Sequence, residues 1–166
     1  IENQTISGFL ARLAAPPTDA AIFTGRGLRL LGTLISGLVG LAVCGLTLQP
    51  TERRSSGYAL QYGMFLLVMV LCVPAAWMHY QTLLVVLFAA LLLHLRERQV
   101  SLGYAAALGL SFGLISYGNQ WTFFGGTMMG VLTWIGLSYK LYGMLLLGGL
   151  VGATLLGASR KLAERQ

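Results

Sequence analysis

Residues 55–95 read SSGYALQYGMFLLVMVLCVPAAWMHYQTLLVVLFAALLLHL and contain no Asp, Glu, Lys or Arg. One unbroken helix over this stretch would be on the order of 60 Å long, about twice the thickness of the hydrocarbon core of a bilayer. The stretch therefore predicts two apolar helices. Pro74 is expected in the last turns of the first of them, and Trp77 to Tyr80 in the turn between the two.

Apolar runs of similar length lie on both sides of this stretch, and together they predict five membrane spans. Hydrophobic residues make up 56% of the 166 residues and charged residues only 10%, against about 25% charged residues in a soluble domain. We therefore expect an all-α, polytopic bundle of transmembrane helices. The expected spans are 27–48, 58–77, 80–95, 100–117 and 141–158.

The basic residues predict the orientation of these spans. They cluster at the ends of the apolar runs, as in the cytoplasmic loops of membrane proteins. Seven of them fall on one side, which is then the cytoplasm: Arg53, Arg54, Arg96, Arg98, Arg160, Lys161 and Arg165. The remaining four fall on the outer side: Arg12, Arg26, Arg29 and Lys140. We expect a multi-pass protein of the bacterial cytoplasmic membrane with a cytoplasmic C-terminus.

Residues 119–138 are apolar enough to form a sixth span. A sixth span would move the C-terminal basic cluster to the outer side and weaken the charge bias. We therefore expect an interfacial or re-entrant segment on the outer face, broken at Gly125 and Gly126.

Several classes of function are disfavoured by what the sequence lacks. It has no HExxH, CxxC, P-loop or dinucleotide-binding motif, so we expect no metal and no cofactor. The net charge of +6 is spread over the ends of apolar runs, so no nucleic-acid partner is expected. All five acidic residues lie in expected loops or tails, which argues against an ion pathway.

Among the polar residues, His79 has the most informative position, because it lies at an outer membrane boundary between Trp77 and Tyr80. An imidazole there can exchange a proton or, when charged, hold a phosphate. The alternative is an interfacial histidine exposed to water. The outer-side Arg12, Arg26 and Arg29 are candidate phosphate ligands, with snorkelling at the interface as the alternative. His94 is expected to be a boundary residue on the cytoplasmic side.

Three short motifs resemble the family 87 glycosyltransferases. NQTISGFLARL (Asn3 to Leu13) resembles that family's N-Q-S-x-x-G-x-x-x-R-L segment, and VPAAWMHY (Val73 to Tyr80) resembles its S-P-x-x-W-x-H-H element. SYKLYGMLLL (Ser138 to Leu147) is similar to the opening of its last helix. Two positions depart from the pattern: Val73 stands where serine is common, and Tyr80 replaces the second histidine. The acidic residue that such enzymes carry in an early outer loop is not in this chain.

The resemblance implies a polytopic GT-C enzyme related to polyprenol-phosphate-mannose-dependent mannosyltransferases. Such an enzyme transfers a hexose, mannose-like, from a polyprenyl-phosphate sugar to a lipid or glycan acceptor on the outer face. His79 would then be catalytic. The implied substrate-binding residues are Asn3, Gln4, Arg12, Arg26, Arg29, Trp77 and Tyr80.

The chain starts at Ile1 without a signal peptide, so residues 1–166 are expected to be the C-terminal transmembrane part of a longer enzyme and inactive alone. The main alternative is a non-enzymatic membrane module, either a transporter portion or an assembly scaffold. A flippase-like lipid carrier is a third possibility, since it would share the basic groups of the outer face.

Overall fold

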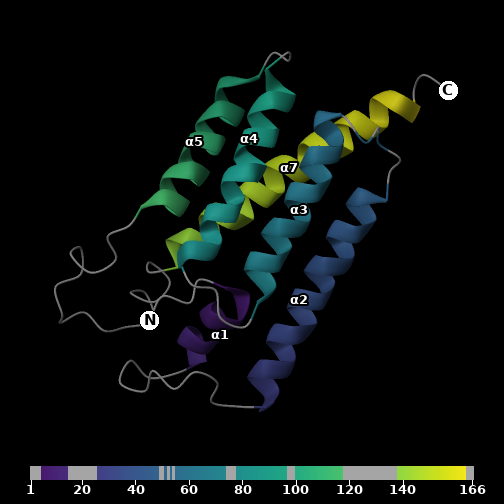
Figure 1. Ribbon diagram of the computed structural model, residues 1–166. Helices are drawn as coiled ribbons and strands as arrows, with labels where there is room; N and C mark the ends of the chain where they lie inside the picture. The colour runs from purple at the N-terminus through teal and green to yellow at the C-terminus, as the bar shows by residue number, and fades with distance from the viewer. Residues whose placement is uncertain are drawn as a thin grey trace.

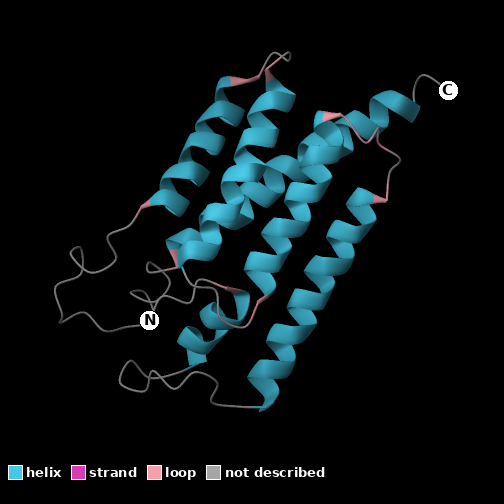
Figure 2. Cartoon of the chain, viewed as in Figure 1, coloured by secondary structure: helices cyan, strands magenta, loops and turns pink. Residues whose placement is uncertain are grey.

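A computed structural model shows a bundle of α-helices (Figure 1), and the residues that it describes are 5–14, 26–48, 51, 53, 55–73, 78–96, 100–117 and 138–163. No strand occurs within these ranges (Figure 2), so the all-α class is confirmed for them. The helices are α1 (Ile6–Ala14), α2 (Arg26–Thr47), α3 (Ser56–Cys72), the 3₁₀ helix η1 (Met78–Leu83), α4 (Leu84–Leu95), α5 (Leu102–Ser116) and α7 (Tyr139–Ala163).

The five long helices alternate in direction, so that the bundle has two distinct ends (Figure 1). One end, called here the α1 end, holds α1, η1, the start of α2, the end of α5 and the start of α7. The opposite end holds the end of α2, the start of α3, the end of α4, the start of α5 and the end of α7. Side-chain contacts agree with this division: Tyr117 packs on Tyr139 at the α1 end, and Ser56 contacts His94 at the opposite end.

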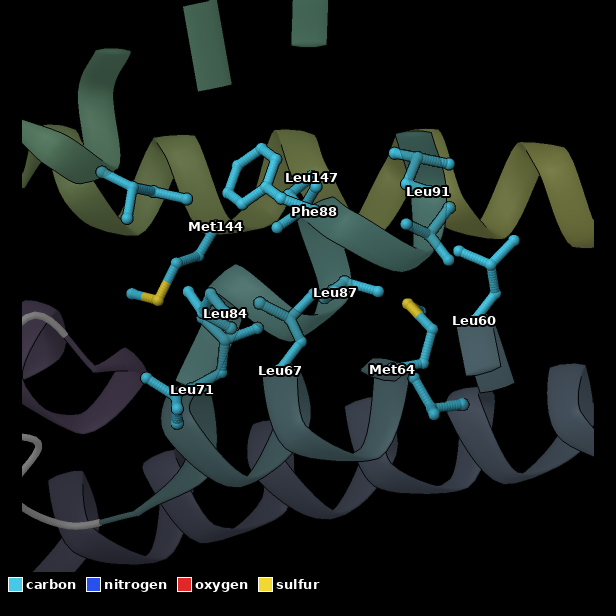
Figure 3. Close-up of a cluster of buried hydrophobic side chains, with 14 of the residues drawn as sticks. Leu60, Met64, Leu67, Leu71, Leu84, Leu87, Phe88, Leu91, Met144 and Leu147 are labelled. Carbon is cyan, nitrogen blue, oxygen red and sulfur yellow. The ribbon is translucent and has the colours of Figure 1, made fainter. Parts of the chain in front are cut away.

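The core lies between α3, α4 and α7 (Figure 3). It is built from aliphatic and Met side chains that are at most 1% exposed: Leu60, Leu67, Leu84, Leu87, Leu91, Met144 and Leu147. Glycine allows close approach of α3 and α4, because a Cβ on Gly63 would lie 3.3 Å from the Cα of Leu87. Small residues of this kind let helix backbones pack closely where lipid supplies no hydrophobic drive for association.

Polar side chains join α5 to α7. The Ser111 hydroxyl donates to the carbonyl oxygen of Gly143 over 2.8 Å. About two turns away along the same pair of helices, the Tyr104 hydroxyl donates to the carbonyl oxygen of Leu150 over 3.1 Å and lies 2.8 Å from the Thr154 hydroxyl. These bonds satisfy polar groups that would otherwise be costly in an apolar environment.

Two helices, α2 and α7, are long and apolar enough to cross a membrane, over Leu30–Thr47 and Tyr139–Gly157. Helices occur at all five expected positions, but α3, α4 and α5 have only 17, 12 and 15 residues. The structure therefore supports two candidate spans and does not by itself establish five. On α2 the leucine side chains point outward: Leu34 is 55% exposed, Leu38 67% and Leu41 70%.

One expected boundary was wrong. The helix expected over 58–77 ends at Cys72, and Val73 has the extended backbone angles φ −63° and ψ 140°. A residue that precedes proline disfavours the helical region, so Pro74 stops α3 rather than lying within its last turns. The last span, expected over 141–158, agrees with the part of α7 that is apolar enough to cross a membrane, Tyr139–Gly157, and the helix itself continues to Ala163. The expected interfacial or re-entrant segment 119–138 lies outside the described residues except for Ser138.

Candidate functional site

The residues expected to form the site are described to different extents. Asn3, Gln4 and Trp77 lie outside the described residues. For Arg12 in α1, Arg26 and Arg29 in the first turn of α2, and His79 in η1, the structure describes the backbone alone. Tyr80, also in η1, has a side chain that is 38% exposed. The backbone positions of all five lie at the α1 end of the bundle (Figure 1).

The short helix α1 begins at a capped residue and packs against two other helices. The buried Thr5 hydroxyl accepts a hydrogen bond from the backbone N–H of Gly8 over 3.1 Å, as an N-cap threonine does. A Cβ on Gly32 of α2 would lie 3.1 Å from the Ser7 hydroxyl. Phe9 meets Tyr142 of α7 edge to face, with ring centroids 6.3 Å apart. The backbone that carries Arg12 is therefore held against α2 and α7.

The helix η1 is joined to the start of α7 by a partly buried polar contact. The Lys140 ammonium donates to the Oε1 atom of Gln81 over 3.2 Å, and Lys140 is only 2% exposed. Gln81 follows His79 by two residues in η1. The contact thus brings the first turn of α7 beside the segment that carries His79.

Lys140 and Gln81 were not among the site residues expected from the sequence. Lys140 was counted only as one of four basic residues on the outer side. The sequence nevertheless distinguishes Lys140, because it is the only charged residue between Arg98 and Arg160. A single charge in so long an apolar stretch is by default a candidate for function. Gln81 carries no comparable signal.

Lys140 is buried in the first turn of α7. Transfer of an ammonium group from water into a protein interior costs several kcal/mol unless it is compensated. The first turn of a helix carries the positive end of the helix dipole, which disfavours a cation and favours an anion. Ser138, two residues before Lys140, and Thr5 at the start of α1 are also fully buried. The α1 end therefore contains several buried polar side chains.

The second histidine lies at the other end of the bundle. The Nδ1 atom of His94, near the end of α4, lies 2.8 Å from the Ser56 hydroxyl in the first turn of α3. This contact ties the last turn of α4 to the first turn of α3. Within the described ranges, no group of three or more His, Cys, Asp or Glu side chains could hold a metal ion.

Comparisons of the chain with family models, with curated proteins and with solved structures found no match. The functional assignment consequently depends on the motifs in the sequence and on the placement of their residues.

Proposed function

We propose that this chain is the C-terminal transmembrane part of a GT-C-type glycosyltransferase of the bacterial cytoplasmic membrane. The reaction is transfer of a hexose, mannose-like, from a polyprenyl-phosphate sugar to a lipid or glycan acceptor at the outer face. The observation that carries the proposal is that the described parts of three motif segments lie at one end of the bundle. These segments are 3–13, 73–80 and 138–147.

Two contacts hold these segments together although they are far apart in the sequence. The ring contact between Phe9 and Tyr142 joins the first segment to the third. The hydrogen bond from Lys140 to Gln81 joins the third segment to Gln81, which directly follows the second segment in the sequence. A shared active site requires such convergence, whereas three unrelated chance matches would be free to fall at different ends of the bundle.

The proposed location in a membrane is supported by the outer surface of the bundle. The outward-facing leucines of α2 would be an unusually large exposed apolar patch on a protein surrounded by water, but they are well placed against lipid. The full proposal has five spans, with α3, α4 and α5 shorter than average. Short spans are accommodated by local thinning of the bilayer and by snorkelling of flanking basic residues.

The chemistry requires two tasks at the α1 end. The acceptor hydroxyl loses its proton as its oxygen forms a bond to the anomeric carbon. At the same time the bond from that carbon to the phosphate oxygen breaks, and the polyprenyl phosphate leaves with the bonding electron pair. His79 takes the proton as general base or, as imidazolium, stabilises the leaving phosphate. Arg12, Arg26 and Arg29 are the candidate phosphate ligands on the same end.

The remaining candidate site residues have positioning roles in the proposal. Asn3 and Gln4 supply amide groups that hydrogen-bond sugar hydroxyls. Trp77 and Tyr80 supply amphipathic rings at the depth of the lipid headgroups, where such rings prefer to lie.

The test compares the two histidines in the full-length enzyme that contains this chain. His79→Ala should lower the turnover of polyprenyl-phosphate-sugar transfer by about 10²-fold to 10⁴-fold, the usual contribution of a general acid or base. His94→Ala is the matched control at the opposite end, and its turnover per folded molecule should be close to that of the wild type. Equal turnover in the two variants would refute the catalytic role of His79. A wild-type enzyme that transfers no sugar from any polyprenyl-phosphate donor would favour the non-enzymatic membrane module.

A further inference from the structure

Two exposed arginines lie where α3 begins and α4 ends, at the end of the bundle opposite α1 (Figure 1). Arg53 lies three residues before Ser56, the first residue of α3, and Arg96 is the C-cap of α4. Both side chains are exposed, and neither has an ion-pair or hydrogen-bond partner within the described part of the chain. A guanidinium is always charged, so two positive charges are open to an anion here.

A contact between α3 and α4 brings these arginines to one part of the surface. The Ser56 hydroxyl lies 2.8 Å from the Nδ1 atom of His94. Arg53 is three residues from Ser56 in the sequence, and Arg96 is two residues from His94. Residues so close in the chain cannot lie far apart in space, so each arginine is within reach of a group bound beside this contact.

The backbone that carries Arg53 is fixed on both sides. The Thr51 hydroxyl donates to the Oε1 atom of Gln61 in α3. On the other side, the Ser55 hydroxyl caps α3 by accepting a hydrogen bond from the backbone N–H of Tyr58 over 3.2 Å. The arginine is therefore held in place before any ligand binds, which lowers the entropy lost on binding.

The residues next to the two arginines in the sequence leave an excess of positive charge. Residues 52–54 read ERR and residues 96–98 read RER, so these two short segments contain four arginines and two glutamates. Clusters of basic residues immediately beside a membrane span attract anionic lipid headgroups. The composition of the two segments is of this kind.

The length of α3 places this end at the depth of lipid headgroups. The helix has 17 residues, about 26 Å at 1.5 Å per residue, whereas the hydrocarbon core of a bilayer is roughly 30 Å thick. Basic side chains that flank so short a span extend to the headgroup layer. A lipid phosphate is thus available at the level of Arg53 and Arg96.

We propose that Arg53 and Arg96 bind the phosphate of an anionic membrane phospholipid at the end of the bundle opposite α1. The planar guanidinium donates paired hydrogen bonds that match phosphate oxygens, and an anionic lipid adds the net negative charge that a zwitterionic lipid does not. The inference rests on the membrane location in the proposed function and is independent of the proposed reaction. It gives this end a lipid-binding role separate from the candidate site at the α1 end.

The test measures lipid binding by the full-length protein that contains this chain. The protein in a neutral detergent is titrated with phosphatidylglycerol, phosphatidylcholine or soluble glycerol phosphate, and bound molecules are counted by native mass spectrometry. Arg53→Gln and Arg96→Gln should each weaken the first phosphatidylglycerol binding step by about 5-fold, the usual contribution of one basic residue at an anionic membrane surface. The wild type should bind phosphatidylcholine more weakly than phosphatidylglycerol.

Arg160→Gln is the matched control, because it makes the same substitution in the last turn of α7, at the same end of the bundle. Its phosphatidylglycerol binding should be close to that of the wild type. Equal weakening in all three variants would mean that only the overall charge of this end matters, and would overturn the site at Arg53 and Arg96. Equal binding of the two phospholipids by the wild type would overturn it as well.

The remaining outcomes separate the sources of phosphate and the two proposals. Glycerol phosphate binding as tightly as phosphatidylglycerol would overturn the assignment to a lipid. Arginine-dependent phosphatidylglycerol binding in a protein that transfers no sugar would leave this inference standing and refute the proposed reaction. Sugar transfer by a protein that shows no preference for phosphatidylglycerol would do the reverse.

Discussion

Tyr117 and Tyr139 contact each other across the ends of α5 and α7. Their ring centroids are 5.7 Å apart with the rings nearly perpendicular, and the Tyr139 hydroxyl donates to the carbonyl oxygen of Tyr117 over 3.2 Å. The polypeptide therefore leaves α5 and enters α7 at the same end of the bundle.

The first prediction concerns this topology. Single cysteines are introduced at Gln99, Asn119 and Gly136 in a Cys44→Ala, Cys72→Ala background, which removes both native thiols. Because Tyr117 and Tyr139 lie together, the cysteines at 119 and 136 should react with an impermeant maleimide from the same side of the membrane. The cysteine at 99 should react from the other side. Labelling of 119 and 136 from opposite sides would contradict the Tyr117–Tyr139 contact.

The second prediction concerns the outer face of α2. Leu38 is 67% exposed and Leu67 in the core is 1% exposed. If α2 faces lipid, a spin label at position 38 in reconstituted protein should be broadened strongly by oxygen, which concentrates in lipid, and weakly by a water-soluble nickel complex. A label at Thr51, exposed in the α2–α3 connection, provides the aqueous reference. Equal broadening by nickel at positions 38 and 51 would mean that α2 does not face lipid.

The third prediction concerns the close packing of α5 on α7. A Cβ on Gly143 would lie 2.9 Å from side-chain atoms of Ile115 and Leu114 and 3.0 Å from the carbonyl oxygen of Ser111. Gly143→Ala should therefore destabilise the bundle by about 1–3 kcal/mol, the usual cost of overpacking. The control is Gly149→Ala on the same helix, where a Cβ would meet nothing within 4 Å. When thermal unfolding is measured in detergent, the midpoint temperature of Gly143→Ala should be lower than that of the wild type, and that of Gly149→Ala should not.

The fourth prediction concerns the hydrogen bond at the opposite end. Ser56→Ala and His94→Ala should each lower the stability by about 0.5–1.5 kcal/mol, because each removes one partner of the 2.8 Å contact. The double variant should cost less than the sum of the two single changes, since the shared bond can be lost only once. Strict additivity in denaturant unfolding would show that the contact contributes nothing.

Much of the helical organisation could be predicted from the sequence. Long apolar runs separated by polar or basic clusters located all five long helices, because every backbone polar group in an apolar environment must be satisfied within a helix. The helix ends were predicted less well. Pro74 ends α3 through its effect on the backbone of Val73. The hydropathy of the apolar run does not indicate this local effect. The absence of acidic residues from the described helices was also correctly predicted from the sequence.

The sequence by itself determined the all-helical class, the apolar runs and the residues available for chemistry. Only the tertiary structure decided which of these residues meet. Helices such as α3 and α5 are apolar on every side, so they carry no stripe that shows which face turns inward. Their rotation is set instead by close contacts such as Gly63 on Leu87 and Gly143 on Ile115. The contact between Lys140 and Gln81 joins residues 59 positions apart. It forms because η1 and the start of α7 lie together in the bundle, and no local sequence pattern specifies that arrangement.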